Sequence, residues 1–151
     1  MTEYSDVELL ARADPLKIVS KYSHLGLAKR IRWLVESMKI IEVKYNSKIP
    51  STYDELDDMP GVGNYTANAI LCFAFNKRVE IVDTNVMRLY GRVFNIAKEE
   101  VKMKAQSILP SYKWREFNEA LLDFSSLVCK KIGLCDKCPI HHMCSFFIRG
   151  V

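Results

Sequence analysis

The sequence has no long uninterrupted apolar run, and it has few glycines and prolines, six and five in 151 residues. Charged residues break every apolar stretch before it reaches the roughly 18 residues that a membrane-spanning helix needs, which excludes a membrane span. The first ten residues, MTEYSDVELL, carry acidic side chains where a secretory signal would carry positive charge. We therefore expect a cytoplasmic protein.

The composition is that of an ordinary globular protein, with 49% hydrophobic and 26% charged residues. This is enough apolar material to bury a core, so disordered and fibrous classes are excluded. The chain is predicted to form one compact unit, or two small ones that share a core. No internal repeat or low-complexity segment is present.

Apolar residues recur at helical spacing and nowhere alternate for long with period two, which predicts an all-α fold. Two short helices are expected first, with Ser5 and Asp14 as N-caps and with Pro15 at the first position of the second helix. A long helix follows and ends before Pro50. Its apolar stripe consists of Ile31, Leu34, Val35, Met38, Ile41 and Tyr45.

Shorter helices are predicted over the rest of the chain. One covers Tyr53–Asp57, one follows the turn at 60–63, and one is capped by Asp83. A polar helix spans about Lys98–Leu109, and a last helix begins near Trp114 and ends at Cys129. Their apolar positions are Ala67, Ile70, Leu71, Ala74 and Phe75; Val86, Leu89, Tyr90 and Val93; Phe117, Leu121, Phe124 and Val128.

The five cysteines are unevenly distributed. Cys72 stands alone in a helical pattern and is predicted to be a buried core residue. The other four fall within sixteen residues near the C-terminus, at Cys129, Cys135, Cys138 and Cys144. In a cytosolic protein such a group favours a metal or cluster over disulfides. Four thiolates hold either zinc or a [4Fe–4S] cluster, so the count alone leaves both open.

Positive charge is concentrated in two stretches, although the net charge is only +4. Residues 27–48 contain six basic and two acidic side chains, and residues 130–151 contain four and one. Between them lies an acidic run of Asp54, Glu55, Asp57 and Asp58. Two basic faces are compatible with a polyanionic partner, and equally with solvated surface.

A turn with two glycines joins two predicted helices. Glycine permits positive φ and removes the side chain that would hold a phosphate away. The amides at the start of the next helix then form an anion site for a DNA phosphate. A plain helix–helix turn is the alternative. The predicted DNA-binding residues here are Pro60, Gly61, Val62, Gly63, Asn64 and Thr66.

The motif Pro-Gly-Val-Gly-x-Tyr-Thr-Ala at residues 60–67, followed by Asp83-Thr-Asn-Val-Met-Arg88, resembles the endonuclease III superfamily of DNA glycosylases. The resemblance continues through residues 117–125 to the cysteines and covers about residues 25–147. Within the superfamily the chain is most similar to the archaeal-type thymine–DNA mismatch glycosylases. The resemblance implies a helix-hairpin-helix glycosylase fold with a C-terminal [4Fe–4S] loop and double-stranded DNA as the partner.

The resemblance also implies roles for two residues. Asp83 matches the essential catalytic carboxylate, which stabilises the positive charge that develops on the deoxyribose; a purely capping role is the alternative. Tyr65 stands where bifunctional relatives carry the lysine that forms a Schiff base. Because tyrosine cannot form an imine, a monofunctional enzyme is expected, unless Tyr65 only packs.

The cysteine spacing x5-x2-x5 is one residue shorter in its first gap than the superfamily pattern, and a surface loop tolerates such a deletion. The resemblance therefore favours the iron–sulfur cluster over zinc, with Lys130, Lys131 and Lys137 contacting DNA phosphates. His141 and His142 are expected at the surface.

The resemblance further implies that the usual N-terminal helices of the barrel are absent, so that the fold is truncated. We expect residues 1–77 to form the hairpin portion and 78–151 the cluster portion, with a second copy or a partner chain on the uncovered face.

The expected function is release of thymine or uracil opposite guanine in base-excision repair. Adenine opposite 8-oxoguanine is the alternative substrate. A non-catalytic DNA-binding module, or one part of a split glycosylase, is the alternative class.

Overall fold

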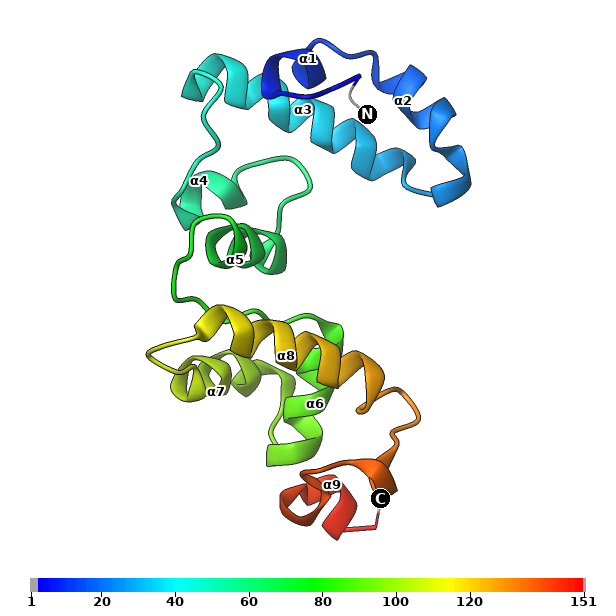
Figure 1. The fold of residues 1–151 in the computed structure, drawn as a ribbon, viewed down its shortest axis with the longest axis vertical. Coiled ribbons are helices and arrows are strands. Elements are labelled where there is room, and N and C mark those ends of the chain that lie inside the picture. The colour runs from blue at the N-terminus through cyan, green and yellow to red at the C-terminus, as the bar shows by residue number, and fades with distance from the viewer. Residues whose placement is uncertain (1–2, 151) are drawn as a thin grey trace. The chain divides into compact units, whose positions relative to one another are not determined.

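The computed structural model describes residues 3–150, and all regular structure in that range is helical, as predicted (Figure 1). The chain divides into two compact units, residues 1–67 and 68–151, and each is described by itself. No helix in the described range combines the length with the hydropathy that a membrane crossing requires.

Two short helices of the first unit lie along one long helix (Figure 1). The short helices bury Ala11 and Ile18, and the long helix buries Val35 and Ile41. Leu34, which belongs to the predicted apolar stripe, is 47% exposed. The elements are α1 (Val7–Ala11), α2 (Pro15–Lys21), a 3-10 turn (Ser23–Leu25), α3 (Ala28–Tyr45), α4 (Tyr53–Asp57) and the start of α5 (Asn64–Phe73).

The observed N-caps of the first two helices test the caps that were predicted from the sequence. Asp14 caps α2 as predicted, because its carboxylate accepts the Leu16 amide at 2.9 Å. The prediction for Ser5 is wrong. Asp6 caps α1 and accepts the Leu9 amide at 2.8 Å, while the Ser5 hydroxyl donates to Asp6. Both residue types are competent caps, and the start of α1 at Val7 gives the position to Asp6.

The second unit is built around α6, which packs against α7, α8 and α9 (Figure 1). Its predicted stripe of Val86, Leu89, Tyr90 and Val93 is entirely buried. The predicted polar helix begins with a 3-10 turn and continues as α7. The elements are α6 (Thr84–Phe94), the turn Lys98–Glu100, α7 (Val101–Ile108), α8 (Trp114–Leu127), the turns Cys135–Lys137 and His141–Met143, and α9 (Ser145–Ile148).

A buried asparagine of α8 fixes the segment that leads to Asp83. The Asn118 amide nitrogen donates to the Val79 carbonyl at 2.9 Å, and its oxygen accepts the Ile81 amide at 3.2 Å. The same nitrogen lies 3.5 Å from the Cys72 sulfur. Cys72 is fully buried, as predicted, and burial raises the pKa of its thiol. Asn118 therefore satisfies backbone groups that no helix pairs.

Candidate functional site

The turn between α4 and α5 requires glycine at one position. Gly61 has φ +74, in the left-handed region, and a Cβ there would lie 2.5 Å from Cε3 of Trp33. Gly63 differs from the expectation, because its φ is not positive. Nothing lies within 4 Å of a Cβ built on Gly63, so its contribution is an open approach to the backbone.

Two side chains of helix α3 support this turn. The Trp33 ring lies against Gly61, and the buried Ser37 hydroxyl donates to the Pro60 carbonyl at 3.2 Å. The Val62 amide donates to the Met59 carbonyl at 3.0 Å and closes the turn. These contacts link the turn to helix α3 and close it on itself.

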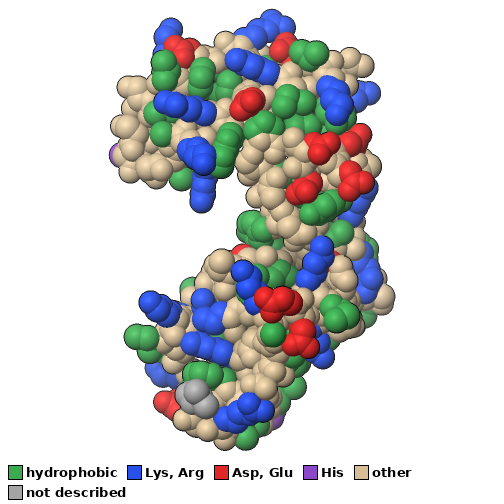
Figure 2. All heavy atoms as spheres, turned by 180° about the vertical axis from the view of Figure 1, so that it is seen from behind, with side chains coloured by type: hydrophobic (Ala, Val, Ile, Leu, Met, Phe, Trp, Pro, Cys, Tyr) green, Lys and Arg blue, Asp and Glu red, His purple; other side chains and the backbone are tan. Residues whose placement is uncertain are grey.

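The start of α5 has the properties of an anion site. The first N–H groups of an α-helix have no partner within the helix and lie at its positive end. Gly63 and Asn64 are exposed there. The side-chain amide of Asn64 donates a hydrogen bond to the Tyr53 hydroxyl at 2.9 Å. Figure 2 shows acidic side chains over α4 and Lys and Arg side chains over α3. An anion is therefore favoured at the turn and disfavoured along α4.

Tyr65 and Asp83 belong to different units. Tyr65 lies in the first turn of α5 and is 42% exposed. Asp83 is half-buried and caps α6, as predicted: its Oδ1 accepts the amides of Asn85 at 2.9 Å and Val86 at 2.7 Å. Its Oδ2 accepts the Asn85 side-chain amide at 3.0 Å. Three donors therefore fix the orientation of this carboxylate.

A hydrogen-bonded chain leads from Asp83 to the first of the clustered cysteines. The Asn85 side-chain oxygen accepts from Nη2 of Arg88 at 3.1 Å. The Arg88 guanidinium also donates to the Cys129 carbonyl at 2.7 and 2.9 Å and to the Ser125 carbonyl at 2.9 Å. Asn85 and Arg88 belong to the motif at residues 83–88, but no role was predicted for either from the sequence. Their three-residue spacing on a capped helix was the available signal.

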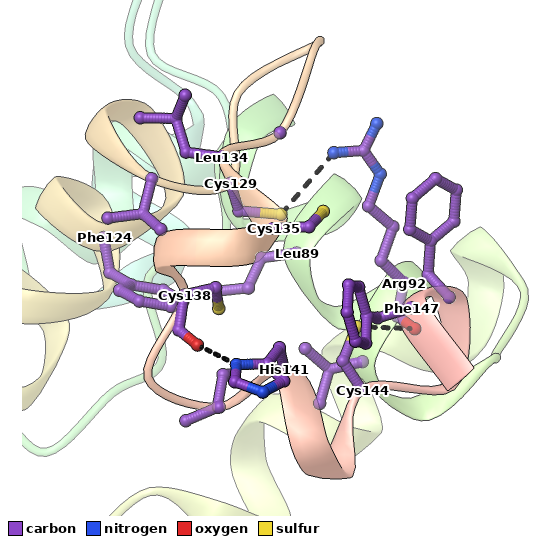
Figure 3. Close-up of a pocket in the computed structure, with 15 residues that line it drawn as sticks. Leu89, Arg92, Phe124, Cys129, Leu134, Cys135, Cys138, His141, Cys144 and Phe147 are labelled. Carbon is purple, nitrogen blue, oxygen red and sulfur yellow. Dashed lines mark hydrogen bonds between the residues drawn. The ribbon is translucent and has the colours of Figure 1, made fainter. Parts of the chain in front are cut away.

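The four clustered cysteines line a single pocket in the second unit (Figure 3). Leu89, Phe124 and other apolar side chains form the rest of its wall. None of the four forms a disulfide. Within residues 3–150, no three His, Cys, Asp or Glu side chains converge closely enough to hold one metal ion. A set of four soft thiol donors around one apolar pocket nevertheless has the chemistry of a thiolate cluster site.

Basic residues surround this pocket at the surface. Lys130, Lys131 and Lys137 are all exposed, and so is His142. His141 is partly buried: its Nδ1 lies 2.7 Å from the Cys138 carbonyl, and its ring packs on Phe147.

Comparisons with known proteins first define a class. Residues 44–73, which contain α4, the turn and α5, match the model of the helix-hairpin-helix motif. A thymine/uracil-DNA glycosylase of Methanothermobacter thermautotrophicus is 29% identical, over 96% of this chain and 70% of its own length. An adenine DNA glycosylase of Buchnera aphidicola is 32% identical, over 97% of this chain but only 44% of its own length.

An endonuclease III of Thermotoga maritima is 30% identical over 97% of this chain and 71% of its own length. The structure of a thermostable thymine-DNA glycosylase superposes with a TM-score of 0.89 at 29% identity, covering 97% of this chain and 72% of that one. A non-covalent complex of endonuclease III with DNA gives 0.87 at 25% identity, over 98% and 72%. The class is that of helix-hairpin-helix DNA glycosylases, hydrolases of N-glycosyl bonds in DNA repair. The chain belongs to the endonuclease III superfamily, as its motifs predicted.

Proposed function

We propose that this chain is a monofunctional DNA glycosylase that removes thymine or uracil mispaired with guanine. The observation that carries the proposal is the Asp83 carboxylate, held by three donors at the start of α6. We further propose that residues 1–77 supply the hairpin portion and residues 78–151 the cluster portion of the enzyme.

Cleavage of the N-glycosidic bond develops positive charge on the deoxyribose, and a fixed anion stabilises that charge more than it stabilises the neutral substrate. Asp83 is the anion in this proposal, and it also orients the water that attacks the sugar carbon. Its carboxylate is oriented in advance by the Asn85 and Val86 amides. Little reorganisation is then required during the reaction.

Tyr65 determines that the abasic strand is left intact, because a phenol cannot form the imine that precedes strand cleavage. The Tyr65→Lys protein is expected to give a borohydride-trappable adduct with substrate DNA, whereas the parent gives none. Efficient trapping by the parent would contradict the monofunctional assignment.

The choice of base rests on similarity. A thymine/uracil-DNA glycosylase is 29% identical over 96% of this chain, and the structure of a thymine-DNA glycosylase superposes with a TM-score of 0.89. Base release should be measured on duplexes with thymine or uracil opposite guanine and with adenine opposite 8-oxoguanine. Release of adenine alone would replace the proposed substrate. Tight binding without release from any duplex would support a non-catalytic module or a part of a split enzyme.

Double-stranded DNA is the proposed partner of the hairpin residues 60–64 and 66 and of Lys130, Lys131 and Lys137. Such contacts position the duplex without reading its sequence. Neutralising about four to six phosphates predicts a log–log salt slope of about −4 to −5. Affinity that does not change with salt would exclude this partner.

A [4Fe–4S] cluster bound by Cys129, Cys135, Cys138 and Cys144 is the proposed cofactor. When bound, it supplies a rigid centre that holds the surrounding loops. The protein should then show broad visible absorption that bleaches on reduction, with iron and sulfide in equal amounts. Stoichiometric zinc without iron, in aerobic and anaerobic preparations alike, would overturn the assignment.

Association with a second copy or another chain is also proposed, because Leu9, Leu16 and Leu34 are exposed by 47, 61 and 47%. Full burial of an exposed leucine side chain contributes about 1.5–3 kcal/mol, so covering a leucine that is about half exposed contributes roughly half of that. Sedimentation and base release measured on the same sample test this. An active monomer would overturn it.

A further inference from the structure

Arg92 of α6 contacts the cysteine site from the side of the Cys129–Cys135 loop (Figure 3). Its Nη1 donates to the Lys130 carbonyl at 2.7 Å, and its Nη2 donates to the Lys131 carbonyl at 2.9 Å. These two carbonyls belong to residues whose side chains carry the positive charge of the loop. The guanidinium thus fixes the backbone from which both lysines project.

The same guanidinium reaches a cysteine sulfur. Nη1 lies 3.6 Å from Sγ of Cys129, within the range of a hydrogen bond to sulfur. A planar group with five donors on three nitrogens can serve two carbonyls and a sulfur at once, whereas an ammonium group carries its three donors on one nitrogen and cannot span the same acceptors.

Arg92 also contacts the other end of the site. Its guanidinium lies 4.7 Å from the centre of the Phe146 ring, two residues after Cys144. The Cys144 thiol is 3.7 Å from the Arg92 backbone carbonyl. One residue of α6 therefore touches the segments that carry the first and the last cysteine.

We propose that Arg92 is a positioning residue that joins the cysteine site to the Lys130–Lys131 loop. Its N–H group at the Cys129 sulfur raises the reduction potential of the bound cluster, and its two carbonyl contacts hold the loop for DNA phosphates. The inference rests on the proposed cluster and DNA partner. Hydrogen bonds to sulfur and local charge are both known to set cluster potentials.

The test uses the cluster-loaded protein, with Arg92→Gln and Arg92→Lys as variants. Arg78→Gln is the matched control, because Arg78 is an arginine of the same unit that also donates to two consecutive backbone carbonyls, those of Leu109 and Pro110, and does not line the cysteine pocket. Iron content, reduction potential and duplex affinity are measured for each protein.

Arg92→Gln should retain iron and shift the potential negative by about 59 mV, a tenfold change in the one-electron equilibrium. Its duplex affinity should fall about tenfold, with a shallower salt slope. Arg92→Lys should shift the reduction potential less than Arg92→Gln does, because lysine keeps the positive charge. Its duplex affinity should still fall, because lysine lacks the planar guanidinium that donates to both carbonyls. Arg78→Gln should match the parent in both measurements.

An unchanged potential and affinity in loaded Arg92→Gln would overturn the inference and leave the proposed function intact. A parent protein without iron would instead overturn the proposed cluster. If both Arg92 variants lose iron, hydrogen exchange of the backbone amides of residues 130–134 decides whether Arg92 positions the loop. Faster exchange there, with α6 and α8 as in the parent, supports the positioning role, whereas unchanged exchange overturns it.

Discussion

Two helices of this chain, α5 and α6, begin at sites that attract negative charge. The two sites differ in whether the chain itself provides the anion. At α6 the chain supplies its own anion, because Asp83 accepts two backbone amides. At α5 the preceding residue is Gly63, which has no side chain to accept the amides. Nothing lies within 4 Å of a Cβ built on it, so the backbone there is open to an external group. The same helix-end electrostatics thus fixes a carboxylate in one place and leaves room for an external phosphate in the other.

The two sites also differ in what holds them in place. The hairpin turn is held by contacts with Trp33 and Ser37 of α3, and neither contact involves the cysteine site. Asp83 is linked through Asn85 and Arg88 to the Cys129 carbonyl. The hairpin, which is the proposed DNA-binding element, is therefore expected to fold independently of a cofactor. The segment of Asp83, the proposed catalytic residue, is expected to depend on the cysteine site.

Asp83→Asn should give the largest effect, a loss of base release of about 10³-fold with duplex affinity unchanged. Asparagine is a competent N-cap, so α6 should persist and only the stabilising charge is lost. Asp14→Asn, which changes the cap of α2 in the same way, is the matched control. Equal activity in parent and Asp83→Asn would make Asp83 a purely structural cap.

Cys138→Ser should lose the iron, unfold residues 129–150 locally and weaken duplex binding about 100-fold through the displaced lysines. Circular dichroism and iron analysis follow the loss. Cys72→Ala is the control, because Cys72 is buried away from the four clustered cysteines and the variant should stay loaded. Full iron content in Cys138→Ser would remove that residue from the ligand set.

Arg88→Lys should lower base release about tenfold while leaving duplex affinity near that of the parent. A lysine cannot bridge the Asn85 oxygen and two carbonyls as the guanidinium does. Single-turnover rates at saturating enzyme separate this effect from binding. Loss of affinity without loss of rate would show that the chain of bonds does not support Asp83.

Gly61→Ala and Gly63→Ala sharpen the comparison within the hairpin itself. Alanine at residue 61 meets both the left-handed φ and Trp33, so unfolding free energy should fall by about 1–3 kcal/mol. Alanine at residue 63 should change stability by less than about 0.5 kcal/mol yet weaken duplex binding several-fold. Denaturant melts and binding titrations measure both. Equal effects of the two variants on stability would contradict the assigned roles.

Features determined by neighbouring residues were predictable from the sequence. The five-residue helix Tyr53–Asp57, the Asp14 and Asp83 caps and the buried stripe of α6 are found as expected, because capping and periodicity act within a few residues. The prediction of Ser5 as a cap failed because Asp6, the next residue, is an equally competent cap, and the point where the helix begins decides between such neighbours. The motifs also gave the family correctly.

Contacts between distant segments were decided by the tertiary structure. Trp33 closes on Gly61. Arg88 and Arg92 meet the end of α8 and the loop after it from 37 to 41 residues away along the chain. The spacing of Asn85 and Arg88 is a local signal for their mutual contact. No local pattern shows which distant segment either arginine meets, because the partners there are backbone carbonyls that any sequence provides. Only the packing of α6 against α8 brings donor and acceptor within bonding distance, and the fold thereby joins Asp83, the proposed catalytic carboxylate, to the cysteine site.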